Sequence, residues 1–392
     1  MKKCRLPKNP AEKAVLTFDG KFLTEVLKRV DSVTRFSESA DALTHSHLLA
    51  SFKGDVFVIG RTPDTFVCHE IVGASCTVDT VFNIDPKSLM GLIAKRGLLE
   101  AEYDHPMVKM KEAKGRYKAE FKVKQLSPEQ VPMVEEGLRH HIEGGHVMER
   151  DVIDKMNEGI RAVRIKDVIT DEAIICRVMC DGKNMKVISP GDWTSAQYIA
   201  PFKKQVEPFR FSMTGSMFDL VNKFCGDEKV TFHVDSSAFT AEAESFVMTL
   251  PPVQSNDEDY RFVENMLDDL GKPVVAVNIT GDLQTPFNNI ATLVDAKGNV
   301  NAQIHVKKKE LRIKFGNDSG SASDALKLSK ETKKEFKTLV DTRIMRELLR
   351  NIGKEESHDL GFYGSSVNDL SAFTLRYENE KRSLLYFGYV PQ

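Results

Sequence analysis

The stretch Ser88-Leu89-Met90-Gly91-Leu92-Ile93 recurs twice in this chain with small changes, as Ser216-Met217-Phe218-Asp219-Leu220-Val221 and as Arg343-Ile344-Met345-Arg346-Glu347-Leu348-Leu349. The offset from Ser88 to Ser216 is 128 positions, and the offset from Ser216 to Arg343 is 127. A glycine follows each stretch and is suited to end a helix: Gly97, Gly226 and Gly353. A long internal period of this kind indicates one module built three times.

The same offset recovers a hairpin in each module. Gly54 and Gly182 are 128 positions apart, and each lies between two apolar runs typical of strands, which predicts a tight turn. In the third module Lys307-Lys308-Lys309-Glu310 holds the equivalent place. Apolar residues at helical spacing predict one more helix ahead of each hairpin, over residues 19–35, 149–164 and 282–295. The chain is therefore expected to be an α+β protein, with two helices packed on antiparallel sheets in each of three domains.

Length and composition agree with three soluble domains. The chain has 392 residues, 41% of them hydrophobic, and 55 basic against 57 acidic side chains for a net charge of −2. The expected domains are 1–127, 146–253 and 273–392, joined by a linker at 128–145 and an acidic linker at 254–272. No run of 18 apolar residues predicts a membrane span, and the start has no apolar segment typical of a secretory signal. We therefore expect a cytoplasmic protein without a membrane partner.

Motifs that carry catalysis or bind cofactors are not found. The sequence has no phosphate-binding P-loop, no dinucleotide fingerprint, no zinc-protease motif and no nucleophile elbow. Cys176 and Cys180 could be zinc ligands, but buried thiols of a reducing compartment are the favoured interpretation. His45 and His47 are interpreted as solvated loop residues. No enzyme, cofactor or metal site is therefore expected, although catalytic groups far apart in sequence stay an open alternative.

Three such units in one chain resemble the bacterial-type DNA sliding clamp, the processivity β subunit of replicative DNA polymerase. The most similar stretches are 82–90, 189–193 and 385–391, and their divergence suggests a bacteriophage version. The resemblance implies a ring of two head-to-tail copies, with helices lining the hole and strands forming the wall. It also implies three partners: double-stranded DNA held without sequence readout, and a DNA polymerase and a clamp loader that bind through short peptides.

Basic residues opposite the apolar helix faces are the candidate DNA contacts. In this interpretation they lie near DNA phosphates and give weak, salt-sensitive binding. The alternative is an ordinary solvated helix face, and the first helix of the third module has no basic residue before Lys297. The candidates are Lys21, Lys28, Arg35, Lys87, Lys95, Arg150, Arg161, Arg164, Lys223, Arg343, Arg346 and Arg350.

The resemblance also implies a cleft for partner peptides between the second and third domains. Its matching positions are Gly191, Trp193, Thr194, Phe246, Val247, Met248, Tyr389, Val390 and Pro391. An apolar cleft with a tryptophan and a flexible methionine suits a peptide anchor, whereas Trp193 could equally be a packing residue. A second functional class stays open, a repeat-built scaffold or interaction protein such as a transcription co-factor or virion component, without a role in polymerase processivity.

Overall fold

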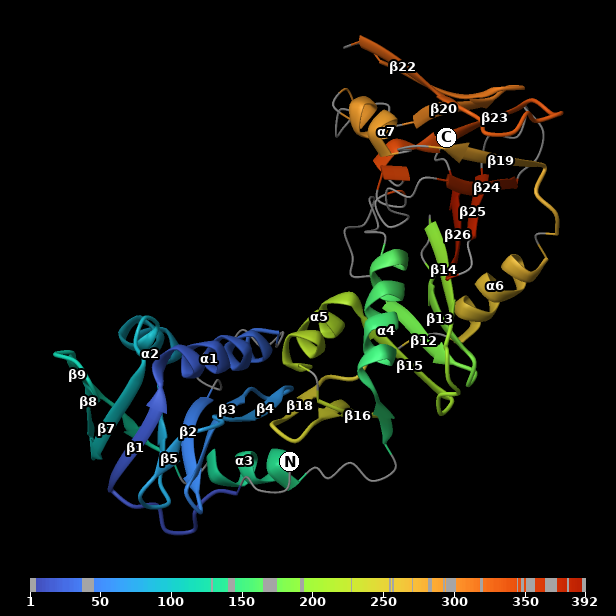
Figure 1. The fold of residues 1–392 in the computed structure, drawn as a ribbon. Helices are drawn as coiled ribbons and strands as arrows, with labels where there is room; N and C mark the ends of the chain where they lie inside the picture. Colours follow the sequence, from blue (N-terminus) through green and yellow to red (C-terminus); the bar gives the residue numbers. More distant parts are fainter. Residues whose placement is uncertain are drawn as a thin grey trace. The chain divides into compact units, whose positions relative to one another are not determined.

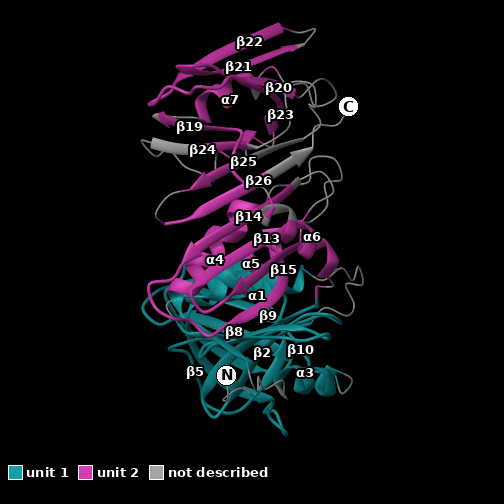
Figure 2. Cartoon of the chain, turned by 90° about the vertical axis from the view of Figure 1, so that its right-hand side faces the viewer, with its two compact units in different colours: residues 1–150, 219–252 teal, residues 151–218, 253–392 magenta. Residues whose placement is uncertain are grey.

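The computed structural model forms two compact units, which are coloured separately in Figure 2. Unit 1 contains residues 1–150 and 219–252, and unit 2 contains residues 151–218 and 253–392. The boundary passes through the second sequence module, so its strands are divided between the units. The structure describes residues 5–36, 46–127, 130–139, 145–164, 175–190, 194–226, 228–253, 255, 257–269, 271–280, 284–291, 293, 301–317, 320–343, 345–346, 349, 357–363, 372–378 and 381–389.

The described residues of unit 1 form two antiparallel sheets and three complete helices. The helices are α1 (Gly20–Thr34), α2 (Pro86–Ile93) and α3 (Gln130–Arg139). A five-stranded sheet has the order β5-β1-β7-β8-β9, and a nine-stranded sheet has the order β10-β6-β2-β3-β4-β18-β17-β16-β11. The strands are β1 (Lys13–Asp19), β2 (Ser46–Phe52), β3 (Asp55–Arg61), β4 (Phe66–Glu70), β5 (Ser75–Cys76), β6 (Val81–Asn83), β7 (Leu98–Asp104), β8 (Met107–Glu112), β9 (Lys118–Lys122), β10 (Lys124–Gln125), β11 (His146–Met148), β16 (Val230–Val234), β17 (Phe239–Glu242) and β18 (Phe246–Leu250).

Side-chain caps explain where the first two helices begin. The Asp19 carboxylate accepts a hydrogen bond of 2.9 Å from the backbone N–H of Phe22, an N-terminal group that has no partner inside the helix. Asp85 caps α2 in the same way by accepting from the N–H of Lys87 at 3.2 Å, with Pro86 in the first turn, where its missing N–H costs nothing. The prediction of a helix over residues 19–35 is confirmed, because the flanking residues are its caps.

Strand β3 shows why its run Val56-Phe57-Val58-Ile59 is continuously apolar. Alternate residues of a strand point to opposite faces of the sheet, and here both faces are covered. Phe57 and Ile59 belong to a buried cluster with Val134 of α3, while Gly60 meets α1 on the other face. A Cβ at Gly60 would lie 2.6 Å from the Val30 side chain, so this glycine allows α1 to approach closely. Figure 1 shows α1 and α3 on the two faces of this sheet.

Unit 2 contains an eight-stranded sheet with the order β15-β12-β13-β14-β26-β25-β24-β19 and a four-stranded sheet with the order β22-β21-β20-β23. Its helices are α4 (Arg150–Val163), α6 (Asp257–Asp268) and α7 (Gln284–Ala291), and α5 (Gly215–Phe224) spans the unit boundary. The strands are β12 (Ile175–Cys180), β13 (Asn184–Ser189), β14 (Thr194–Pro201), β15 (Phe209–Thr214), β19 (Val275–Thr280), β20 (Asn301–Val306), β21 (Glu310–Asn317), β22 (Gly320–Lys327), β23 (Phe336–Asp341), β24 (Ser357–Tyr363), β25 (Ala372–Glu378) and β26 (Ser383–Tyr389).

Both large sheets run across a boundary between sequence modules. In unit 1, β4 of the first module pairs with β18 of the second, with His69 opposite Phe246. In unit 2, β14 of the second module pairs with β26 of the third, with Thr194 opposite Gly388. Backbone hydrogen bonds therefore join neighbouring modules into continuous sheets.

The segments predicted as linkers contain helices, α3 within 128–145 and α6 within 254–272. Each helix buries a narrow apolar stripe on a sheet. Val134 of α3 is 1% exposed, and Tyr260 and Val263 of α6 pack with Ile188. The acidic run at 257–259 forms the first turn of α6, where negative charge is favoured by the helix dipole. The sequence pattern predicted no helix in either linker because these stripes are too narrow to stand out from the charged residues around them.

Arg177 of β12 fixes α6 to its sheet. Its guanidinium lies 3.9 Å from the centre of the Tyr260 ring, donates to the Ser255 hydroxyl at 2.9 Å and pairs with Asp257 at 2.5 Å. The Arg177 side chain is 4% exposed, whereas that of Asp257 is 59% exposed. The hydrogen bond to Arg177 is the main reason that the pKa of Asp257 is lowered.

The three predicted hairpins are confirmed. Lys53 and Gly54 have φ values of 54° and 90° between β2 and β3, Gly182 has φ 96° between β12 and β13, and residues 307–309 join β20 to β21. Helix α4 occupies the predicted range 149–164, whereas α7 is described over Gln284–Ala291, within the predicted 282–295. In the third copy of the opening stretch, residues 342–343, 345–346 and 349 are helical, and the others from 344 to 350 lie outside the described residues.

Candidate nucleic-acid interface

The predicted helix faces present exposed cations. The opposite face of α1 is buried, with Leu23, Val26 and Val30 at most 1% exposed, so the basic face of this helix is directed to solvent. The exposed candidates are Lys21, Lys28, Arg35, Lys87, Lys95, Arg161, Arg164, Lys223 and Arg346. Arg350 lies outside the described residues.

Carboxylates on α1 neutralise part of its basic face. Lys28 pairs with Glu25 at 2.9 Å, and Arg35 pairs with Asp31 at 2.6 Å. Among the described residues Lys21 has no ion pair. The positive potential of α1 is therefore smaller than its basic residues alone indicate, because each pair presents a dipole rather than a net charge to an approaching phosphate.

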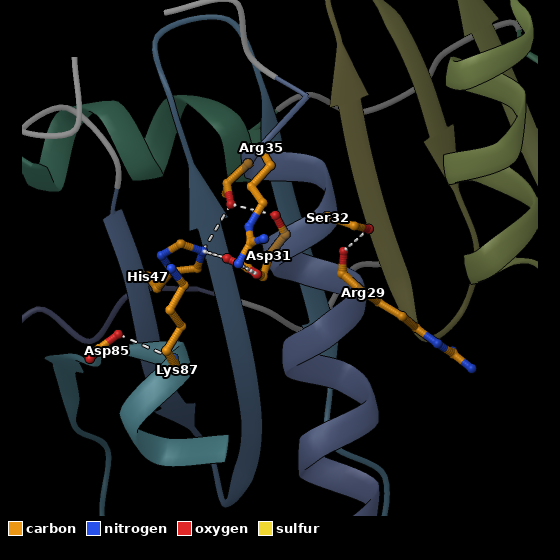
Figure 3. A network of polar contacts seen from close by, with 8 residues as sticks. Arg29, Asp31, Ser32, Arg35, His47, Asp85 and Lys87 are labelled. Carbon is orange, nitrogen blue, oxygen red and sulfur yellow. Dashed lines mark hydrogen bonds and ion pairs between the residues drawn. The ribbon is translucent and has the colours of Figure 1, made fainter. Parts of the chain in front are cut away.

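Figure 3 shows how the end of α1 is connected to β2. The Thr34 hydroxyl lies 3.0 Å from His47 Nε2, and Asp31 Oδ1 lies 3.9 Å from the same nitrogen. The His47 side chain is 12% exposed and belongs to β2, so its prediction as a solvated loop residue was wrong. The reason is the tertiary packing of α1 over the sheet, which gives this imidazole a hydroxyl partner.

Two of the predicted DNA contacts also have hydrogen-bond partners within the protein. Arg150 Nη1 donates to the carbonyl oxygens of Cys225 at 2.8 Å and Gly226 at 3.1 Å, beyond the end of α5. Arg343 makes a bidentate contact with Asp341, at 3.1 Å through Nε and 2.7 Å through Nη2, and its side chain is 30% exposed. These contacts engage Nη1 of Arg150 and both Nε and Nη2 of Arg343, so fewer of their donors are available to a phosphate than sequence spacing indicates.

Sequence spacing missed several cations near these helices. Arg96 lies just beyond α2 and stacks on Tyr117 with 3.9 Å between the guanidinium and the ring centre. Lys155 of α4 lies between the charged and apolar faces, 5.8 Å from the ring of Phe202. Arg29 of α1 is half-buried and is drawn in Figure 3. None of the three follows the helical spacing used to select the basic faces, and no local signal would have found them.

The predicted peptide cleft is brought together only in part. Thr194 pairs with Gly388, which brings the start of β14 beside the end of β26. The side chains of Thr194 and Tyr389, and all of Gly191, Trp193, Val390 and Pro391, lie outside what the structure describes.

The remaining cleft candidates belong to β18 in the sheet of unit 1. Phe246 and Met248 are 0% exposed and Val247 is 5% exposed. Side chains without accessible surface cannot line an open groove, so these three are core residues in this structure. The match of these residues to the last strand of the second module did not reveal that β4 pairs with this strand.

The cysteines in the described part of the chain are all buried. Cys176 and Cys180 are both buried in β12, and burial raises the pKa of the Cys176 thiol to about 12. No three histidine, cysteine, aspartate or glutamate side chains in that part come together in a way that could hold a metal ion. None of its helices has the length and apolar character needed to cross a membrane.

Solved structures of bacterial clamps share the fold over nearly the whole chain. A putative DNA polymerase III β subunit from Eubacterium rectale matches with a TM-score of 0.74 and 12% identity, covering 96% of this chain and 98% of that one. The DNA polymerase sliding clamp from Bacillus subtilis matches with 0.74 and 12%, covering 97% and 99%. The β subunit from Thermotoga maritima matches with 0.74 and 11%, covering 97% and 99%. No family model and no curated protein matches the sequence.

Proposed function

From the three-module α+β fold that this chain shares with DNA polymerase III β subunits, we propose that it is a sliding clamp. Two copies, joined head to tail, encircle duplex DNA and tether a replicative DNA polymerase in the cytoplasm. The observation that carries the proposal is the full-length similarity to solved clamps, with 96% or more of this chain covered. Identity of about a tenth fits a diverged version, such as that of a bacteriophage.

Two unpaired sheet edges support the head-to-tail ring. Among the described strands, β9 is hydrogen-bonded to β8 alone and β22 to β21 alone. Such edges favour pairing with another chain, and closing a ring removes them. One edge belongs to the first module and the other to the third, as a head-to-tail contact requires.

The side chains at both edges favour the same pairing. Phe121 lies beside Val108 in the five-stranded sheet, and Leu326 lies beside Leu311 in the four-stranded sheet. Val108 and Leu311 are at most 2% exposed, whereas Phe121 and Leu326 are half-buried because no neighbouring strand covers them. Pairing β9 with β22 of a second copy would remove both side chains from water, which stabilises the contact by roughly 1 kcal/mol or more for each.

The solution mass is the first test. A ring of two copies has twice the 44.1 kDa of one chain. Phe121→Asp or Leu326→Asp should each give a monomer at micromolar concentration, because a carboxylate would be buried at the new strand pair. Val72→Asp is the matched control, since Val72 is 62% exposed and lies in a turn outside both edges. Its mass should equal that of the unchanged protein.

Mixing the two monomeric variants tests the head-to-tail arrangement. In the mixed pair, the intact β22 of the Phe121→Asp chain can meet the intact β9 of the Leu326→Asp chain. The mixture should therefore recover a dimer with one working interface. A symmetric contact of β9 with β9, or of β22 with β22, would give no such recovery and would contradict the head-to-tail ring.

Retention on circular DNA tests encirclement. Cysteines introduced at positions 121 and 326 should close the ring covalently when it assembles around nicked circular DNA. The closed ring should then resist high salt and leave the DNA when the circle is linearised. Release from intact circles at high salt would refute encirclement and favour the alternative of a clamp-like scaffold or interaction protein.

Polymerase tethering has its own test. With a clamp loader supplied, the run length of a polymerase on primed circular DNA should increase when this protein is added. Truncation of residues 389–392 should remove binding of polymerase and loader peptides while leaving the dimer mass unchanged. Equal run lengths with and without the protein would remove the processivity role even if the ring forms.

A further inference from the structure

Two lysine-rich turns meet at one end of the four-stranded sheet of unit 2. Residues 307–309 join β20 to β21, and residues 328–335 join β22 to β23. From 307 to 337 the sequence has ten basic and five acidic side chains, a net charge of +5 in a chain whose total is −2. The positive charge of the third module is therefore concentrated in this part of its sheet, and α7 carries none.

Backbone hydrogen bonds hold the two turns together. The N–H of Thr332 donates to the Lys308 carbonyl at 2.9 Å, and the N–H of Leu328 donates to the Lys309 carbonyl at 2.9 Å. The lysines therefore cannot separate to reduce their mutual repulsion. A recess of about 510 Å³ lies at this place, and its lining includes Lys307, Lys308, Lys309 and Lys327.

Nearby carboxylates neutralise only part of this charge. Glu331 is shared by Lys308 at 3.5 Å and Lys309 at 3.1 Å, and Glu335 lies 3.6 Å from His305. Within the described part of the chain, no ion pair is made by Lys307, Lys327, Lys330, Lys333, Lys334 or Lys337. The positive field is also felt by His305, whose pKa is lowered first by burial and then by Lys337 and Lys307.

We propose that these two turns, residues 307–309 and 328–337, form a second DNA-contact surface that binds duplex phosphates outside the helix faces. The surface is built from lysine, a compact cation that suits repeated phosphates without base readout. All seven basic residues of the two turns are lysines, and Arg312 of the neighbouring β21 is already paired with Glu310 at 2.7 Å.

The chemistry of the recess argues against a protein or single-stranded partner. Protein interfaces are anchored by aromatic or large apolar side chains, whereas the apolar lining here is Ala325 alone once Leu326 is covered by the proposed contact of β22 with a second copy. Single-stranded nucleic acid is held by bases stacked on exposed aromatic rings. The phenylalanines of this sheet, Phe315 and Phe336, are 4% and 5% exposed and offer no such platform.

The inference rests on the proposed function for its biological setting, because a clamp meets duplex DNA. Its physical content does not require a ring. A single protomer should bind a short linear duplex through these turns, and such a duplex cannot be retained topologically. Failure of the ring tests and failure of this surface are therefore separate results.

The test compares two variants with equal charge change in the full chain. The surface variant carries Lys307→Gln, Lys330→Gln, Lys333→Gln and Lys334→Gln. The control variant carries Lys183→Gln, Lys203→Gln, Lys204→Gln and Lys272→Gln, four exposed lysines of the same unit. Binding of a fluorescent 20-base-pair duplex is measured from 50 to 200 mM salt, with circular dichroism and the unfolding midpoint as checks of folding.

The surface variant should lose about ten-fold or more in duplex affinity at 50 mM salt, and its salt slope should fall by roughly two to four relative to the control. Equal affinities and slopes for the two folded variants would overturn the proposal. It would also be overturned if polyglutamate of equal charge competed as well as the duplex, which indicates an acidic protein partner. Tighter binding of a single strand than of the duplex would overturn it too.

Discussion

Protonation of His69 should weaken the strand pair that joins the first two modules. His69 is 3% exposed in β4, opposite Phe246 of β18, and its ring lies 5.8 Å from that of Phe224. Nδ1 lies 2.7 Å from the Glu70 carbonyl oxygen, whereas Nε2 is buried without a hydrogen-bond partner. The neutral imidazole is therefore suited to this position, with its proton on Nδ1, and a second proton would be a buried donor without an acceptor.

The charges around His69 agree with a lowered pKa. Burial is the largest cause; the bond to the Glu70 carbonyl opposes it, Arg29 of α1 lowers the pKa further, and Glu228 raises it. Because the folded pKa is below the unfolded value of about 6.5, the unfolded chain binds more protons in that window. Above about pH 6.5, His69 is neutral in both states and does not lower the free energy of unfolding. As the pH falls below this value, the unfolded chain binds a proton more readily than the folded chain, and the free energy of unfolding decreases. Between pH 7.5 and 5.5 the loss is at most about 1.4 kcal/mol, since one proton contributes about 1.4 kcal/mol per pH unit.

His69→Phe keeps an aromatic ring at this position and removes its titration. The free energy of local opening is measured at pH 7.5 and 5.5 from the exchange rates of β4 and β18 amide hydrogens, because a two-unit protein need not unfold in one step. The unchanged protein should lose more stability than the variant on acidification, by at most about 1.4 kcal/mol, while the other histidines titrate in both and cancel. Parallel pH profiles for the two proteins would refute the assignment of this effect to His69.

Three further substitutions test the packing. Gly60→Ala should cost roughly 1–3 kcal/mol in urea unfolding, because its Cβ would meet an α1 side chain at 2.6 Å. Gly91→Ala in α2 should instead stabilise by about 0.4–1 kcal/mol, since nothing lies within 4 Å of the added carbon; a loss there would contradict the packing argument. Arg177→Met should lower the free energy of local opening of α6 by roughly 1–3 kcal/mol, measured as faster exchange of its amide hydrogens. The reason is the loss of the stack on Tyr260 and of the hydrogen bonds of the guanidinium. Asp257→Asn should have a smaller effect on the same amides, because that carboxylate is mostly exposed, and an equal effect would assign the stabilisation to the ion pair instead.

The sequence predicted correctly which basic side chains are exposed where exposure depends only on the face of a helix. Lys21 and Lys28 are exposed as expected, because residues three and four positions apart share one helix face, and these lysines lie on the face of α1 opposite the buried Leu23 and Val26. Arg150 and Arg343 have the same spacing but are engaged by the Cys225 carbonyl and by Asp341. Helical periodicity tells which face a residue occupies and carries no information about a hydrogen-bond partner elsewhere in the chain.

The sequence by itself determined the local features of this protein. The cap at Asp19 and the turn at Gly54 depend on residues a few positions apart, and the 128-residue period is a recurrence of such local patterns, so all three can be recognised along the chain. Only the tertiary structure decided that β4 pairs with β18, and that α3 and α6 cover the sheets. It also brought the 307–309 and 328–335 turns together. These contacts join residues far apart in sequence, and many strand pairings satisfy the same alternating pattern until the packing of the core selects one.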